Sequence, residues 1–237
     1  MYKFGEDHPI LFEIILIVAA FLAAAVFVVA GSILYLPSEF STSVGRILVG
    51  LILLILYRRA FKAGNPFRNF VILLPAFLFA IWNLFYNLSS GMEIGGTTFF
   101  IEGLLTALAP ALFEEVIFRG IFIYNLQKKG NGDLACLLIS SLVFSLIHAT
   151  NIVGMDLVSV LLQVGYSFVV GMVLAAIYLK NGSIFQVILA HFLTDYTNHI
   201  FVSQASSASA LHLVIFGLLL AAEAVYALVL TVGMRKN

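Results

Sequence analysis

The sequence predicts an all-α polytopic membrane protein, because its composition, its long apolar runs and the placement of its basic residues agree. Hydrophobic residues make up 62% of the 237 residues and charged residues only 10%, and the mean hydropathy is +1.09. Soluble domains carry about 25% charged residues and cannot bury so much apolar surface at this size. Twelve basic residues are balanced by twelve acidic ones, which argues against a nucleic-acid partner because such a partner requires a basic face.

Eight apolar runs are long enough to cross a bilayer as helices, for which about 17–25 residues suffice. They cover residues 10–36, 40–57, 69–88, 98–126, 134–150, 157–179, 183–203 and 211–234. Short polar segments separate the runs, and residue types that favour helix N-caps precede three of them at Thr97, Asp133 and Ser183. The sequence therefore predicts eight transmembrane helices in one membrane domain that spans residues 1–237.

Lys and Arg residues alternate strictly between the two sides of this predicted topology. Outside the runs, the basic residues are Lys3, Arg58, Arg59, Lys62, Arg68, Lys128, Lys129, Lys180, Arg235 and Lys236. All of them fall in the two tails or in every second loop, and the other loops hold none. Because basic loops stay cytoplasmic, we expect an N-in/C-in topology. The first apolar run exceeds the length of a signal-peptide core, so we expect it to remain as an anchor.

Ionisable residues inside the predicted spans are expected to face a partner or a water-filled cavity, because a charge at the bilayer centre costs at least ~2.5–3.5 kcal/mol on insertion scales. Glu13, Arg46 and Glu223 each stand alone on their runs, and Glu102 lies about three helical turns before the next charge of its run. For these four residues we expect structural ion pairs that hold two helices together. His199 falls toward the outer edge of its run, and we expect a structural role there too.

The fourth run differs, because it carries two adjacent carboxylates and a guanidinium. Glu115 and Arg119 are four residues apart with the acid first, the favourable order for an ion pair on a helix. Glu114 is rotated by about 100° from Glu115 and lacks that partner. An unpaired carboxylate in a low dielectric is a candidate general base. A purely structural salt-bridge triad is the alternative for this run.

The fifth and seventh runs add two histidines at about the same depth. Phe144 precedes His148 by one helical turn, and His191 precedes Asp195 in the same way. A rise of about 1.5 Å per residue places Glu114, both histidines and Asp195 in one layer about 10 Å thick near the bilayer centre. We therefore expect these four side chains to meet in one site.

Carboxylates and imidazoles on three helices suit the activation of a water molecule on a carbonyl group. The same four side chains, Glu114, His148, His191 and Asp195, also suit a divalent metal such as zinc. The metalloprotease motif HExxH and the serine-hydrolase motif GxSxG are both absent. Intramembrane chains of such residues also serve as proton relays, so a proton-coupled transporter remains an alternative.

Three motifs in this order resemble those of a known family. Glu114-Glu115-x-x-x-Arg119, Phe144-x-x-x-His148 and His191-x-x-x-Asp195 are similar to the EExxxR, FxxxH and HxxxN/D motifs of the CAAX-protease and bacteriocin-processing (CPBP, or Abi) family of intramembrane endopeptidases. The resemblance covers about residues 100–200. Asp195 departs from the better-understood members, which carry Asn there, and an ionised Asp cannot donate a hydrogen bond to an oxyanion.

The resemblance implies an eight-span helical fold with a catalytic core at about residues 98–203 and a site open to the cytoplasmic side. It implies a glutamate mechanism without a cofactor, in which Glu114 is the general base and His148 positions the water. His191 and Asp195 would stabilise the oxyanion. Glu115, Arg119 and Phe144 would support them.

The expected activity is hydrolysis of a peptide bond in a hydrophobic or lipidated peptide within the lipid bilayer, with a role in bacteriocin immunity or peptide processing. The compact chain favours the bacterial branch of the family, and hence the bacterial cell membrane. The alternatives are a non-enzymatic immunity protein and a proton-coupled transporter. No residue pattern predicts an oligomeric state.

Overall fold

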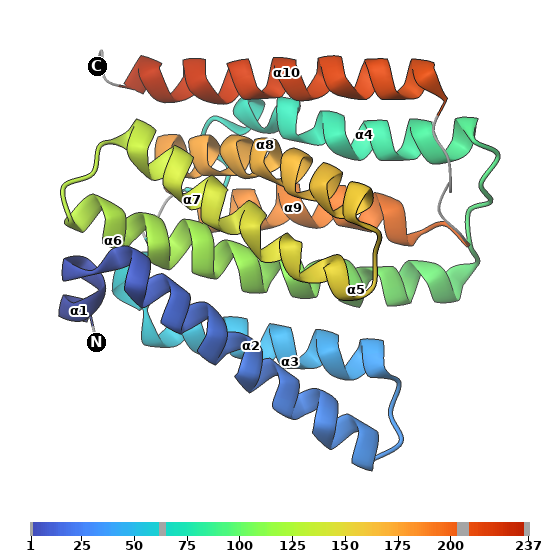
Figure 1. Cartoon of the computed structure of the whole chain (residues 1–237), viewed down its shortest axis with the longest axis horizontal. Coiled ribbons are helices and arrows are strands. Elements are labelled where there is room, and N and C mark those ends of the chain that lie inside the picture. The colour runs from blue at the N-terminus through green and yellow to red at the C-terminus, as the bar shows by residue number, and fades with distance from the viewer. Residues whose placement is uncertain (1, 62–64, 203–208, 235–237) are drawn as a thin grey trace.

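The computed structural model describes residues 2–61, 65–202 and 209–234, and in these ranges every regular element is a helix (Figure 1). Extended pairing is limited there to one isolated antiparallel bridge between Ile94 and Phe201. The all-α prediction is confirmed. Three basic residues used in the topology argument, Lys62, Arg235 and Lys236, lie outside the described residues.

A helix lies at each of the eight predicted positions. The short helix α1 (Tyr2–Asp7) comes first, and the others are α2 (Pro9–Ile33), α3 (Ser38–Leu56), α4 (Leu74–Ser89), α5 (Thr97–Glu115), α6 (Ile123–Lys128), α7 (Asp133–Ile147), α8 (Leu157–Asn181), α9 (Ile184–His199) and α10 (Ala210–Gly233). A π-helical segment, η3 (Val116–Phe122), joins α5 to α6, and a 3-10 helix, η4 (His148–Val153), follows α7.

Six helical segments among the described residues are long and apolar enough to cross a membrane. They are Pro9–Ile33, Ser38–Leu56, Phe70–Ser89, Asp133–Val153, Leu157–Asn181 and Ala210–Gly233. The protein is therefore an integral membrane protein, but six spans meet the criteria rather than the predicted eight. The other two predicted spans, residues 98–126 and 183–203, carry most of the candidate site, and its charged and polar side chains lower their hydropathy. Helix α9 also has only 16 residues, whereas a spanning helix needs about 20.

These two helices pack against each other inside the bundle. Helix α3 packs on α5 from one side, with α2 against α3, while α4 and α8 contact α9 and α10 contacts α8. In Figure 1, α2 and α3 form one edge of the molecule and α4 and α10 the other. Helices that are shielded from lipid in this way can carry polar side chains on the faces that meet each other.

The two ends of the bundle differ in charge. The end that holds the chain termini and the α6–α7 turn, here called the basic end, carries the described basic residues of the tail and loops: Lys3, Arg58, Arg59, Arg68, Lys128, Lys129 and Lys180. The α2–α3, α4–α5 and α7–α8 turns lie at the opposite end (Figure 1), and residues 34–37, 90–96 and 148–156 in them contain no Lys or Arg.

The start of α9 is fixed by local hydrogen bonds. The Ser183 hydroxyl accepts a hydrogen bond from the backbone N–H of Gln186, as the sequence predicts, and Gly182 adopts the left-handed conformation that ends α8. The buried Gln186 amide donates to the backbone carbonyls of Pro66 and Arg68.

At α5 and α7 the N-cap positions are instead Gly96 and Gly132, without a side-chain cap. The predictions of capping by Thr97 and Asp133 were therefore wrong by one residue.

The ion pairs that we expected for four isolated charges are absent from the part of the chain that the structure describes. Glu13 and Glu223 are buried, and neither carboxylate has a hydrogen-bond partner there. Glu102 is exposed, and the Arg46 guanidinium lies 5.9 Å from the centroid of the Phe21 ring. The prediction failed because a lone charge on a helix does not reveal which helix face meets the neighbouring helix.

Candidate active site

A buried ionic network lies at the centre of the bundle. Arg119 Nη1 is 3.2 Å from Glu115 Oε1, and neither side chain is exposed. The same Glu115 oxygen is 2.8 Å from Nδ1 of His191, on α9. The Glu115–Arg119 pair is the one that the spacing predicts, whereas the Glu115–His191 contact was not predicted from the sequence.

Arg119 also contacts two further helices. Its Nη2 donates to the backbone carbonyl of Gly171 in α8 at 3.2 Å, and its guanidinium carbon lies 4.2 Å from the centroid of the Phe144 ring in α7. Arg119 lies within the π-helical segment η3, and single π-helical turns are frequent at functional sites. The network therefore joins η3 and α5 to α7, α8 and α9.

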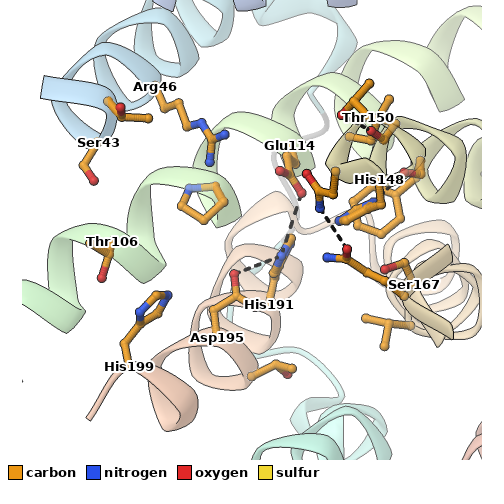
Figure 2. A pocket seen from close by; sticks show the side chains of 18 of the residues that line it. Ser43, Arg46, Thr106, Glu114, His148, Thr150, Ser167, His191, Asp195 and His199 are labelled. Atoms are coloured by element: carbon orange, nitrogen blue, oxygen red, sulfur yellow. Dashed lines mark hydrogen bonds and ion pairs between the residues drawn. The ribbon is translucent and has the colours of Figure 1, made fainter. Parts of the chain in front are cut away.

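His191 presents its two ring nitrogens to different groups. Nδ1 carries a proton and donates a hydrogen bond to Glu115, because an ionised carboxylate can only accept hydrogen bonds. Nε2 lies 3.5 Å from Asp195 Oδ2 and 4.0 Å from Glu114 Oε2 (Figure 2). One ring nitrogen therefore faces both carboxylates, at distances just beyond those of an ordinary hydrogen bond.

The four candidate catalytic residues, Glu114, His148, His191 and Asp195, line one cavity of about 550 Å³. Figure 2 shows Glu114 and His148 on one side of it, and Asp195 beside His191 on another. Glu115 and Arg119 are not among the lining residues, so they support the cavity wall from behind. Phe144 lines the cavity and supports it, because its ring contacts those of His148 and His191 at 5.2 and 6.1 Å.

His148 is held at the end of α7 without a direct polar contact to the other three residues. Its Nδ1 lies 3.2 Å from the backbone carbonyl of Phe144, and among the described residues it has no hydrogen bond to Glu114, His191 or Asp195. The cavity therefore separates His148 from that group, which is the arrangement that a substrate or a water molecule between them requires.

The lining of the cavity extends to the end of the bundle opposite the basic end, and this part of the cavity is here called its mouth. Its outer lining includes Ser38 and Glu39 at the start of α3 and Thr150 and Asn151 after α7. No residue of the basic end as defined above lines the cavity. The sequence predicted both an N-in/C-in topology and a site open to the cytoplasm, whereas this mouth lies away from the basic residues on which the topology prediction rests. Depth along a helix places a residue between the two ends but does not show which end is open.

The cavity contains residues that sequence reasoning did not assign to it. His199, for which we expected a structural role, is exposed and lines the cavity, as does Arg46. A signal for Arg46 was present, because Glu39, Thr42 and Arg46 lie at the helical spacing i, i+3, i+7 around the start of the second apolar run. Such a polar stripe marks one helix face that turns away from lipid.

The donor set fits a metal poorly. Over the described ranges, no group of three or more His, Cys, Asp or Glu side chains is placed to hold a metal ion. We derive no catalytic step through a metal.

The comparisons with known proteins agree with the motifs. Residues 96–197 match the family model described as type II CAAX prenyl endopeptidase Rce1-like. The match is consistent with the predicted resemblance to the CPBP family, and its description names an endopeptidase. The match includes Glu114, His148, His191 and Asp195 but not Arg46. No curated protein and no solved structure matches the chain.

The network generates a prediction about stability. Glu115→Gln should lower the free energy of unfolding by about 3–5 kcal/mol, because it leaves the Arg119 guanidinium buried without its counter-ion. Thermal unfolding of the purified protein in detergent measures the loss. The matched control is Glu102→Gln, the same change at an exposed site on the same helix, which should unfold like the unmodified protein. Equal unfolding midpoints for the two variants would contradict a stabilising role for the network.

Proposed function

We propose that the protein is an intramembrane endopeptidase that cleaves a membrane-associated peptide with a water molecule activated by Glu114. One observation carries the proposal: Glu114, His148, His191 and Asp195 line a single cavity in a segment that matches a family of CAAX prenyl endopeptidases. The buried Glu115 behind this wall orients His191 by accepting its Nδ1–H. A general base, an imidazole that positions the water and a hydrogen-bonded imidazole beside the carbonyl oxygen are groups that suit the hydrolysis of an amide.

The proposed reaction uses side chains only. Glu114 takes a proton from the water, which His148 helps to position, and the resulting hydroxide forms a bond to the substrate carbonyl carbon. The electron pair of the carbonyl moves to its oxygen, which accepts hydrogen bonds from Nε2–H of His191 in its doubly protonated, imidazolium form and from Asp195 in its protonated form. When the C–N bond breaks, Glu114 returns the proton to the leaving amine.

We further propose the eight-span, N-in/C-in topology, with the mouth of the cavity on the extracytoplasmic face. The support is the basic end of the bundle, because loops rich in Lys and Arg stay cytoplasmic and the mouth lies at the opposite end. In a bacterial cell membrane this orientation admits secreted or surface-exposed hydrophobic peptides. It favours peptide processing or bacteriocin immunity over the maturation of prenylated proteins made in the cytoplasm.

A second prediction concerns the general base, Glu114. Glu114→Gln should reduce cleavage by ~10²-fold or more, because the amide cannot accept the proton of water, while the unfolding midpoint stays unchanged. The measurement uses purified protein and a pool of short hydrophobic and prenylated peptides, with Glu102→Gln as the matched control. A Glu114→Gln variant that cleaves normally would overturn the mechanism. Unmodified protein that cleaves no peptide would favour a binding-only immunity protein or a transporter.

Asp195 separates the metal-free mechanism from a metal-dependent one. Asp195→Asn supplies a hydrogen-bond donor whatever the pH, so activity should persist or rise, most clearly at high pH where a carboxylic acid ionises. If a metal were held instead by Glu114, His148, His191 and Asp195, the amide would be a poor ligand, and activity and bound metal would both fall. A chelator titration and elemental analysis of the unmodified protein provide an independent measurement. Stoichiometric zinc together with an inactive Asp195→Asn variant would rule out the metal-free mechanism.

The proposed side of access can be tested with single cysteines. The native Cys136 is buried, so it is first replaced by Ala, and Thr150→Cys at the mouth is compared with Lys129→Cys in the α6–α7 turn. A membrane-impermeant maleimide added to intact cells should label Thr150→Cys, and Lys129→Cys only after the cells are permeabilised. The reverse pattern would place the mouth in the cytoplasm and the termini outside.

A further inference from the structure

Arg46 is a cation in the cavity that the proposed mechanism does not use. It lies near the middle of α3, is half-buried and lines the cavity together with Glu114. Figure 2 shows its side chain projecting into the cavity between Ser43 and Glu114. Arg46 also lies outside residues 96–197, the part of the chain that matches the endopeptidase family, so the family match assigns it no role.

The Arg46 guanidinium has no counter-ion in the part of the chain that the structure describes. No carboxylate there lies within 4.0 Å of it, and its contact is with the face of the Phe21 ring, at 5.9 Å. The other arginine within a predicted span, Arg119, is paired with Glu115. A charged side chain within a membrane span faces a partner or a water-filled cavity, and it marks a functional site by default.

The surroundings of Arg46 indicate what kind of ligand would pair with its guanidinium group. Its neighbours along α3, Thr42 and Ser43, are neutral hydroxyl residues that also line the cavity. The acidic lining residues are Glu39, Glu114, Asp195, and none of them pairs with it. A guanidinium presents a planar fork of N–H donors that matches a carboxylate in a bidentate geometry.

We propose that Arg46 binds a carboxylate of the substrate, either its C-terminal carboxylate or an acidic side chain. The inference rests on the proposed function, because the ligand is the peptide to be cleaved. Along α3, Arg46 lies between the mouth residues Ser38 and Glu39 and the deeper part of the cavity. A peptide that enters the mouth therefore meets Arg46 on its way to Glu114, and the carboxylate contact holds it there. Arg46 is a substrate-binding residue and takes no part in bond cleavage.

The test measures binding without cleavage, in a Glu114→Gln background. Four fluorescent versions of one cleavable peptide are compared, which have a free or an amidated C-terminus and either Asp or Asn at one internal position. Arg46→Gln should weaken binding of the acidic versions by ~10-fold or more, as expected for the loss of a charged hydrogen bond, and leave the version without a carboxylate unchanged. Arg46→Lys should give an intermediate loss. Arg58→Gln, at an exposed position of the basic end, is the matched control and should bind like its parent.

Each outcome has a defined meaning. A loss limited to the free C-terminus or to the Asp peptide supports the proposal and identifies which carboxylate is bound. Equal weakening of all four peptides, or no weakening at all, overturns it. Cleavage by the unmodified protein that does not depend on peptide carboxylates overturns the Arg46 site and leaves the endopeptidase proposal standing. Arg46-dependent binding of acids by a protein that cleaves nothing overturns the endopeptidase instead.

Discussion

The buried guanidinium of Arg119 fixes the relative positions of three helices, because it makes a different contact with each. It pairs with Glu115 on α5, donates to the Gly171 carbonyl on α8 and lies against the Phe144 ring on α7, while Glu115 extends the network to His191 on α9. An ion pair in a low-dielectric interior is costly unless its remaining hydrogen-bonding capacity is met. Gly171 and His191 meet part of that capacity here, whereas Glu115 Oε2 and Arg119 Nε have no hydrogen-bond partner among the described residues. The three sequence motifs are therefore parts of one network, and the cavity wall depends on it.

Two neighbouring glutamates acquire different roles from this arrangement. Glu115 faces the helix interface, where a guanidinium and an imidazole contact it. Glu114, one residue earlier, is turned into the cavity, with His191 Nε2 at 4.0 Å as its near polar neighbour. The difference follows from a rotation of about 100° per residue around the helix. Identical side chains separated by one position can therefore act as a structural counter-ion and as a candidate base.

The sequence predicts those parts of the fold and site that depend on local spacing. Helix positions follow from apolar runs, and the Glu115–Arg119 pair follows from its spacing of four residues. The Glu115–His191 contact joins residues 76 apart in the chain, and no periodicity within either helix reveals it. The predicted ion pairs of Glu13 and Glu223 failed for the same reason, since a partner is determined by how helices rotate and pack. Arg46 is an intermediate case. The sequence shows the polar stripe to which it belongs, but only the fold shows that this stripe faces a cavity.

The direction in which the cavity opens needs both kinds of information. Charge distribution in the loops distinguishes the two ends of the bundle but says nothing about where a cavity lies. The lining residues place the mouth beside the starts of α3 and η4 but carry no information about the membrane side. Combined, they associate the open end with the loops that lack Lys and Arg. A peptide can then reach Glu114 without crossing the basic end, where Lys128 and Lys129 lie about three to four helical turns beyond that carboxylate. The closed, well-packed half of the bundle between them contains the Arg119 network, so the residues that stabilise the fold also separate the site from that side.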